Sequence, residues 1–411
     1  MDGARAVRLL QVHAMSTPAP ANSPDLLREL LAFESVTLTP NIDLIDRVRE
    51  LLAQAGIAST LAADPQDARR SNLFASVGPL EVPGILLSGH TDVVPVTGQP
   101  WTTPPFEATE RDGRIYGRGS ADMKGFVACA VMAMIRAARL PLARPLHLAL
   151  SFDEEIGCVG VRHLLRVLEH MEPAPLLCVV GEPTLMKIGT GNKGKAAYRA
   201  VCCGQAGHSG LAPHFVNAIH TASDLIGALR DVQRDLAEHG PREAGYDVPY
   251  TTVHAGTIKG GTALNIVPAE CEVNFEIRNV AQDDPNQILE RVLELTKTKM
   301  RAAGARPEAE PPRVTTVNSY PGLATAEDSE AVALLASWLP PDTPLTKAAF
   351  GTEGGLFQQL WARTSVLICG PGSIEVAHKA DEYVELSQLQ ACDAMLEKLT
   401  QYLLLQPSKP S

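Results

Sequence analysis

Four short, almost purely apolar runs constrain the fold of this chain more than any other feature of its sequence. They lie at residues 84–90, 146–153, 176–183 and 365–372. Runs of this length that are apolar throughout are typical of strands buried on both faces of a sheet. Between the first three runs lie two stretches, 124–138 and 159–170, whose apolar residues have the spacing of a helix. Buried strands that alternate with helices predict an α/β domain with a mainly parallel sheet.

The pattern changes after about residue 187. We expect strands around KAAYRAVCC, TTVHAGTIKGG, AECEVNFEIRNV and residues 313–317, with helices at 216–236 and 285–302 between them. The order strand, helix, strand, strand, helix, strand is ferredoxin-like. Beyond it, helices are expected at 323–339 and 388–405, around the last apolar run.

These patterns predict a small α+β domain inserted into a larger one. The inserted dimerisation (lid) domain is expected to span 188–313, and the discontinuous catalytic domain 24–187 and 314–405. The Pro-, Ala- and Ser-rich start, 1–23, is expected to be disordered. It lacks the apolar core of a secretion signal, and no apolar run approaches the length of a membrane span. We therefore expect a soluble, cytoplasmic protein.

Composition excludes several classes of protein. Apolar residues make up 45 % and charged residues 20 % of the chain, as in globular proteins, which argues against a disordered chain or a coiled coil. The net charge of −11 argues against nucleic-acid binding, because phosphate contacts need a basic surface. None of the eight cysteines forms a C-x-x-C pair, so we expect reduced, buried thiols in preference to disulfides.

Acidic and histidine side chains follow the predicted strands. In open α/β sheets the carboxyl ends of the strands form the ligand site, so these side chains should converge at one edge. The set comprises His90, Asp92, Asp122, Glu154, Glu155, Glu182 and His378. Any one of them alone is more often a solvated surface charge or a turn residue. Their joint placement at one edge favours a metal site.

Two histidines with several carboxylates suit zinc, manganese or cobalt. We expect His90 and Glu182 at one ion, Glu155 and His378 at the other, and Asp122 bridging the two. Two divalent cations would balance three ligand carboxylates and one bridging hydroxide. Asp92 can accept the second ring N–H of His90 and fix its tautomer. Glu154, left uncoordinated, can act as general base.

Several long motifs resemble one enzyme family. SGHTDVVPV, the segment ending in GRGSADMKG, SFDEEIGCVG, GEPT and GPGSIEVAHKADEYV are similar to the zinc aminoacylase family of acetylornithine deacetylase, succinyl-diaminopimelate desuccinylase and related carboxypeptidases. The resemblance runs from about residue 24 to about residue 403. It implies a two-zinc peptidase-like domain, an inserted dimerisation domain and the roles given above. It also implies a cis peptide bond between Asp122 and Met123.

The resemblance assigns further residues to the substrate. It implies that His208, in QAGHSG, reaches the neighbouring subunit's site and stabilises the oxyanion, and that Asn265 and Arg278 hold polar groups of the substrate. Thr352 and Glu353, in GTEGG, are expected at the substrate as well, with the Glu353 carboxylate at the ammonium of ornithine. Gly351 and Asn192 depart from the family, which more often has Cys and His at these positions.

The expected activity is hydrolysis of an N-acyl amino acid, first of all N2-acetyl-L-ornithine to L-ornithine and acetate in arginine biosynthesis. The same motifs would serve a deacylase of acetylcitrulline or succinyl-diaminopimelate, or a dipeptidase. A non-catalytic metal-binding relative is the rival outside enzymes. The segment GTGNKGK, 189–195, matches a phosphate-binding loop in part, but Ala196 stands where that loop needs Ser or Thr.

Overall fold

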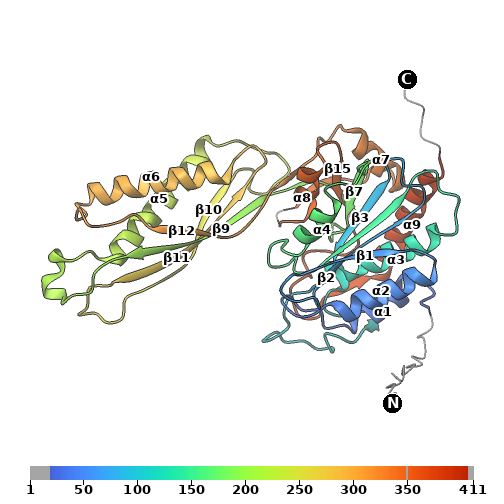
Figure 1. The fold of residues 1–411 in the computed structure, drawn as a ribbon, viewed down its shortest axis with the longest axis horizontal. Helices are drawn as coiled ribbons and strands as arrows, with labels where there is room; N and C mark the ends of the chain where they lie inside the picture. Colours follow the sequence, from blue (N-terminus) through green and yellow to red (C-terminus); the bar gives the residue numbers. More distant parts are fainter. Residues whose placement is uncertain (1–18, 349, 406–411) are drawn as a thin grey trace, which may run out of the picture.

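The computed structural model describes residues 19–348 and 350–405, which form two units built on separate sheets (Figure 1). The larger unit holds a nine-stranded sheet. Eight strands follow one another across it in the order β1 (Ser59–Ala63), β2 (Ser71–Val77), β6 (Leu146–Ser151), β3 (Ile85–His90), β7 (Leu177–Val180), β15 (Ser365–Ile368), β8 (Ile188–Asn192) and β13 (Leu323–Ala324). The ninth, β14 (Leu345–Ala348), pairs with β8.

The centre of this sheet is parallel, as the apolar runs predict. β6, β3, β7 and β15 run parallel to one another, and antiparallel pairs are added towards both edges. All residues of β3, β6 and β7 are buried, which explains why their sequences do not alternate. The carboxyl ends of these strands therefore meet at one edge of the sheet.

Helices cover both faces of the large sheet. Alternate residues of one strand serve the two faces: Leu87 packs into the core beneath one layer of helices, and Leu86 into the core on the opposite face. The first layer contains α1 (Ser23–Leu31), α2 (Ile42–Gln54), α3 (Gly125–Ala137), α7 (Glu330–Trp338) and α9 (Leu386–Leu403). The second contains α4 (Val161–Leu168) and α8 (Gly354–Leu360). A short sheet of β4 (Thr109–Arg111), β5 (Arg114–Tyr116) and β16 (Tyr383–Glu385) lies beside them.

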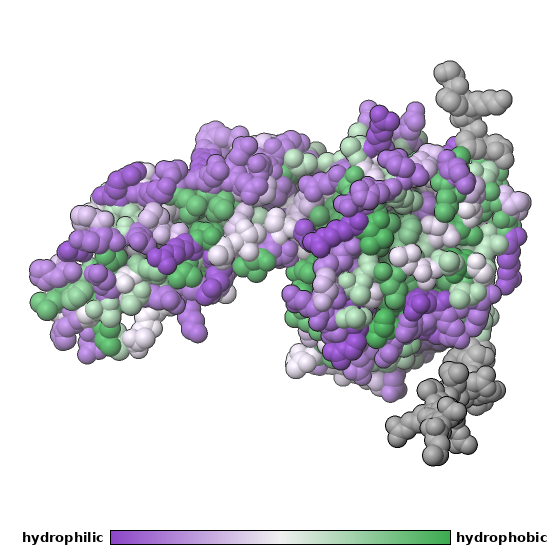
Figure 2. Space-filling view, in the orientation of Figure 1, coloured by the Kyte–Doolittle hydropathy of each residue, from purple (hydrophilic) through white to green (hydrophobic). Residues whose placement is uncertain are grey.

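The smaller unit has the expected ferredoxin-like order. It contains β9 (Gly194–Cys203), α5 (Ala218–His239), β10 (Thr252–Gly260), β11 (Glu270–Asn279), α6 (Pro285–Ala302) and β12 (Arg313–Tyr320). Its antiparallel strands lie in the order β10, β11, β9, β12, and both helices lie along the sheet (Figure 1). A narrow connection joins the two units, with a notch beside it (Figure 2).

Some expected boundaries differ from those observed. β8, which begins at residue 188, belongs to the large sheet, and β12, which runs to residue 320, belongs to the small one. The small sheet therefore begins and ends later in the chain than the range 188–313 that was expected for the inserted domain. The helix expected over 323–339 begins only at Glu330, because residues 323–324 pair with β8 and Ser329 caps the helix. Residues 188–192 form β8 and residues 194–203 form β9, with no helix after the segment GTGNKGK, so the expectation that it is not a phosphate-binding loop is confirmed.

The start of the chain is ordered from slightly earlier than expected, and the cysteines are free thiols, as expected. Of the range expected to be disordered, residues 1–18 lie outside the described part. Asn22 caps α1 and Ser23 is a buried residue of that helix, so order begins before residue 24. All eight cysteines are free thiols, and Cys203 alone among them is not fully buried. Within the described ranges, no helix has both the length and the apolar character that a membrane span requires.

A buried histidine of β6 makes folding stability depend on pH. His147 is 1 % exposed, contacts the Ser76 hydroxyl at 2.7 Å and stacks on Phe74. Burial lowers the pKa of His147 from 6.5 to about 4. The unfolded chain therefore takes up this proton at a higher pH than the folded chain, and stability falls as the pH drops from about 6.5 towards about 4.

We predict that His147→Gln flattens this dependence. Between pH 7 and pH 5 the histidine should cost the wild-type protein about 2 kcal/mol of unfolding free energy, and the variant should lack this contribution. Urea unfolding of both proteins at the two pH values, with chelator present throughout, measures the difference. Equal losses in the two proteins would contradict the assignment.

Candidate active site

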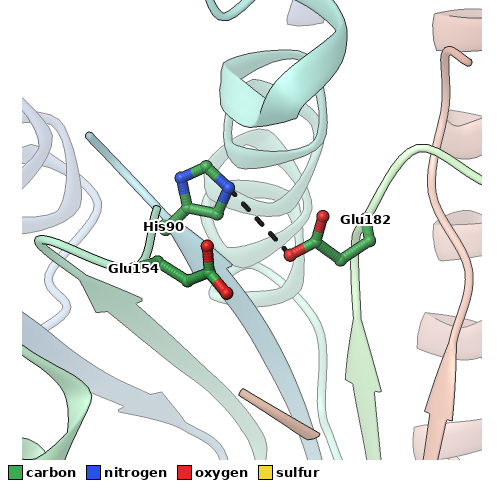
Figure 3. Close-up of side chains that lie close together, drawn as sticks. All are labelled: His90, Glu154 and Glu182. Atoms are coloured by element: carbon green, nitrogen blue, oxygen red, sulfur yellow. Dashed lines mark ion pairs between the residues drawn. The ribbon is translucent and has the colours of Figure 1, made fainter. Parts of the chain in front are cut away.

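Three neighbouring parallel strands bring the expected site residues together. His90 is the last residue of β3, Glu154 and Glu155 follow β6, and Glu182 follows β7. Because these strands lie in the order β6, β3, β7, their carboxyl ends place the side chains at one edge of the sheet. The side chains of His90, Glu154 and Glu182 point towards one another (Figure 3).

The ring of His90 is fixed from both sides. Nδ1 lies 2.9 Å from the main-chain oxygen of Asp92, and because a carbonyl oxygen can only accept, Nδ1 carries the hydrogen. Nε2 lies 3.0 Å from Oδ1 of Asp122 and 4.0 Å from Oε1 of Glu182. When the ring is protonated, Nε2 donates a second hydrogen to Asp122, and against the opposing effect of burial this hydrogen bond raises the pKa of His90. In the neutral ring the Nε2 lone pair is free to bind a metal ion.

Asp122 spans two imidazoles. Its Oδ1 faces His90, and its Oδ2 lies 3.3 Å from Nε2 of His378, which comes from the other end of the chain. Nε2 of His378 also lies 3.0 Å from Oε1 of Glu155. The peptide bond after Asp122 is cis, as expected. One carboxylate between two histidines is the arrangement of a ligand that bridges two ions.

The donor atoms fit divalent metal ions. Two groups of three have all their ligand atoms within 4.8 Å of one another: His90 with Asp122 and Glu155, and His90 with Glu154 and Glu182. Imidazole nitrogen with carboxylate oxygen suits zinc, cobalt and manganese. The five residues expected as ligands are therefore brought together, and Glu154, expected as the general base, lies within the same group of donors.

The electrostatics of the site favour a cation. Burial, reinforced by neighbouring carboxylates, raises the pKa of both Glu154 and Glu182 well above its usual range. Burial and the charge of Asp122 raise the pKa of Glu155 to about 7. Burial alone would raise the pKa of Asp122 too, but hydrogen bonds from His378 and His90 hold it below its usual value. Crowded acids of this kind gain stability from nearby positive charge.

Asp92 supports the site in a different way from the expected one. Its carboxylate oxygen lies 3.7 Å from Nδ1 of His90, whereas its main-chain oxygen makes the hydrogen bond. The carboxylate instead accepts the main-chain N–H groups of Glu154 at 3.0 Å and Glu155 at 3.2 Å. The turn after β6 leaves these N–H groups pointing at Asp92, so Asp92 positions the two glutamates as well as His90.

A cavity of about 170 Å³ lies between the metal-site residues and the small sheet. Arg278 and Tyr320 reach it from β11 and β12, with Nη1 of Arg278 3.2 Å from the Tyr320 hydroxyl. Glu276 lies 3.0 Å from Nε of Arg278 and 3.6 Å from Nζ of Lys195. The lining residues are Asp122, Glu154, Glu155, Gly157, Glu182, Lys195, Arg278, Tyr320, Phe350, Gly351, Ile374 and His378.

Sequence reasoning identified Arg278 but missed Lys195 and Tyr320. Lys195 lies directly opposite Arg278 in the register of β9 and β11, a relation that only strand pairing reveals. Tyr320 also explains why residue 351 departs from the family. A Cβ atom at Gly351 would lie 2.1 Å from the Tyr320 hydroxyl oxygen, so a side chain at 351 would require the Tyr320 ring to move.

His208 and Asn265 lie far from this cavity within one chain. The two segments that carry them contact each other, since the N–H of Ser209 donates to the carbonyl oxygen of Asn265. The segment after β9 and the segment between β10 and β11, which carry these residues, both lie at the end of the small sheet that is remote from the large unit (Figure 1). β9 begins near the cavity and has ten residues, which corresponds to roughly 30 Å of strand before the segment with His208 begins.

Thr352 and Glu353 lie beneath the cavity and not in its wall. The Thr352 hydroxyl donates to Oδ1 of Asn192 at 3.0 Å, and the Ser88 hydroxyl donates to Glu353 at 3.2 Å. Glu353 is 2 % exposed. The expected contact between Glu353 and a substrate ammonium is therefore not available in this arrangement, because the side chain is packed under the strands.

Comparisons with known proteins agree with this geometry. The family model described as peptidase family M20/M25/M40 matches residues 86–402. An acetylornithine deacetylase from Myxococcus xanthus is 34 % identical over 379 residues, which cover 90 % of this chain and 95 % of that protein.

Solved structures share the fold. An M20 family metallo-carboxypeptidase from Sulfolobus solfataricus aligns with a TM-score of 0.73 at 20 % identity, over 93 % of this chain and 99 % of that one. A Bacillus subtilis protein described as a dinuclear metal binding peptidase aligns with a TM-score of 0.64 at 15 % identity, over 93 % and 97 % of the two chains.

The position of Asp122 between two histidines gives a prediction about metal content. The wild-type protein should bind about two equivalents of zinc. His378→Ala should keep about one, because His90 and its carboxylates remain, whereas Asp122→Asn should weaken both positions. Elemental analysis of each protein after dialysis against zinc measures this. Equal metal contents in the two variants would argue against a bridging Asp122.

Proposed function

The chain belongs to peptidase family M20/M25/M40 and is a metal-dependent, amide-hydrolysing enzyme, and from that premise we propose that its substrate is N2-acetyl-L-ornithine. The products would be L-ornithine and acetate, and the ornithine would serve arginine biosynthesis. The similarity to acetylornithine deacetylases over nine-tenths of the chain supports this substrate.

We propose two ions, zinc first, with cobalt and manganese as alternatives. The observation that carries the proposal is Asp122, whose two oxygens face two imidazoles at the edge of a cavity. His90 and Glu182 would hold one ion, and Glu155 and His378 the other. Bound ions of this kind lower the pKa of a water molecule and attract the electrons of a carbonyl oxygen.

Glu154 is our candidate for the general base. It lines the cavity, it is 8 % exposed, and its Oε1 accepts a hydrogen bond from the Cys158 thiol at 3.2 Å. From this position Glu154 would take a proton from the attacking water and pass it to the amine nitrogen as the amide bond breaks. No covalent bond between the chain and the acyl group is needed.

Arg278 is our candidate for the substrate carboxylate. Its guanidinium reaches the cavity wall opposite the metal-site acids, and a guanidinium can bind both oxygens of a carboxylate at once. Asn265 would hold another polar group of the substrate. Because Asn265 and His208 lie at the outer end of the small sheet, we propose that both act on the site of a neighbouring subunit.

A homodimer through the small unit would bring these residues to a second active site. β10 and β12 are the edge strands of the small sheet, and a free strand edge is a natural site for pairing between chains. Exposed apolar side chains lie on β10 at Ile258, on the loop after β10 at Leu264, and on the short helical segment after β9 at Leu211. Apolar surface is interspersed over this unit (Figure 2). In such a dimer, His208 would stabilise the oxyanion of its neighbour's substrate.

The proposed reaction is tested with a panel of substrates. We expect the zinc-loaded protein to hydrolyse N2-acetyl-L-ornithine faster than acetylcitrulline, succinyl-diaminopimelate or a dipeptide. Glu154→Gln should keep its zinc and lose about 10²–10⁴-fold in kcat, while Glu375→Gln, an exposed glutamate near His378, should be unaffected. Another preferred substrate would replace the ornithine proposal, and a near-normal rate in Glu154→Gln would eliminate its role as base.

Mixing two inactive variants tests whether His208 acts between subunits. Glu154→Gln lacks the base and His208→Ala lacks the oxyanion contact, so each homodimer should be nearly inactive. After subunit exchange, mixed dimers should contain one complete site, which gives about a quarter of wild-type activity in an equimolar mixture. If the mixture stays as inactive as its components, His208 acts within its own chain or not at all.

A further inference from the structure

A buried ion pair lies directly behind the bridging aspartate. Arg118 and Glu382 are each 1 % exposed, and Nη1 of Arg118 lies 2.7 Å from Oε2 of Glu382. Neither residue lines the cavity, and neither has a part in the reaction proposed above. Burying a charge pair costs desolvation energy, so such a pair need not stabilise the fold. The groups to which it hydrogen-bonds therefore indicate its role.

The Glu382 carboxylate holds the turn that carries Asp122. Its Oε1 accepts the N–H groups of Ala121 at 2.9 Å and Asp122 at 3.0 Å, and its Oε2 accepts the N–H of Gly119 at 3.0 Å. With Arg118, four donors meet the two oxygens, which is the full capacity of a carboxylate. The main chain is thereby fixed at the residue whose side chain faces both histidines.

Arg118 extends the same network to His378. Its Nη1 also donates to the carbonyl oxygen of Lys379 at 3.2 Å, and its Nη2 donates to Oε1 of Gln99. The amide group of Gln99 in turn donates to the carbonyl oxygen of His378 at 2.9 Å. One connected set of hydrogen bonds therefore reaches the main chain of two residues that lie far apart in the sequence.

We propose that Glu382, Arg118 and Gln99 are positioning residues of the metal centre, which set the separation between Asp122 and His378 before an ion binds. Asp122 Oδ2 and His378 Nε2 are 3.3 Å apart, and each main chain is held by this network. A metal site that is held in place before binding loses less conformational entropy when the ion arrives. Residues that orient ligands typically contribute 10–100-fold to metal affinity.

The alternative is that the pair only joins two segments of the fold. The structure offers a nearby control, because Arg114 of β5 and Glu385 of β16 form an ion pair with a distance of 3.3 Å, and Arg118 and Glu382 lie just outside these two paired strands. That pair is much more exposed, and in the described part of the chain neither of its side chains forms a hydrogen bond or ion pair with Asp122 or His378. Glu385→Gln therefore removes a neighbouring charge pair without breaking a hydrogen bond to the main chain around Asp122 or His378.

The test is a zinc titration of the metal-free full chain against a chromophoric chelator, well below the melting temperature of each variant. Glu382→Gln keeps the size of the side chain but turns an amide N–H₂ towards main-chain N–H groups. We expect it to weaken zinc binding at least 10-fold, and Glu385→Gln to leave the affinity unchanged. Zinc affinity at the wild-type value in Glu382→Gln, even with a lower melting temperature, would overturn the proposal. So would equal weakening in both variants.

Gln99→Met keeps the proposal testable if Glu382→Gln fails to fold. It breaks the bond to the His378 carbonyl and leaves the buried ion pair in place. We expect Gln99→Met to lower the affinity for one of the two zinc ions and to leave the affinity for the other near its wild-type value. Unchanged affinity for both ions would overturn the role of the network. A wild-type protein that bound no zinc would instead refute the metal centre itself.

Discussion

The repulsion between buried carboxylates is the interaction on which this site depends. Asp122, Glu154 and Glu182 are all less than a tenth exposed, and they belong to two groups of donor atoms that share His90. Holding such groups together without a compensating charge costs free energy, and the raised pKa values of Glu154 and Glu182 express that cost. A cation bound at this edge of the sheet would offset that cost.

Some residues of this site are positioned by the strands of the large sheet, and others by the hydrogen-bond network of Glu382, Arg118 and Gln99. Parallel strands β6, β3 and β7 bring His90 and three glutamates to one edge because their carboxyl ends coincide there, and Asp92 adds main-chain hydrogen bonds to Glu154 and Glu155. Asp122 and His378 come from turns, whose positions the sheet does not determine. They are held by main-chain hydrogen bonds to Glu382, Arg118 and Gln99. The least regular parts of the site therefore have the most polar support.

Much of this could be predicted from the sequence, for a physical reason. A strand buried on both faces is apolar throughout, so the charged residue at its end is conspicuous, as with His90 and Glu182. Lys195 and Tyr320 could not be found in this way, because their place in the cavity depends on the register of the small sheet. The burial of Glu353 depends on how α8 packs, which no local pattern indicates.

The central claim is that Asp122 lies between two metal ions. Anomalous X-ray diffraction from zinc-loaded crystals, recorded on both sides of the zinc absorption edge, tests it most directly. The account predicts two zinc peaks about 3.5–4 Å apart, one near each oxygen of Asp122. A single peak, or zinc only at sites remote from Asp122, would contradict it.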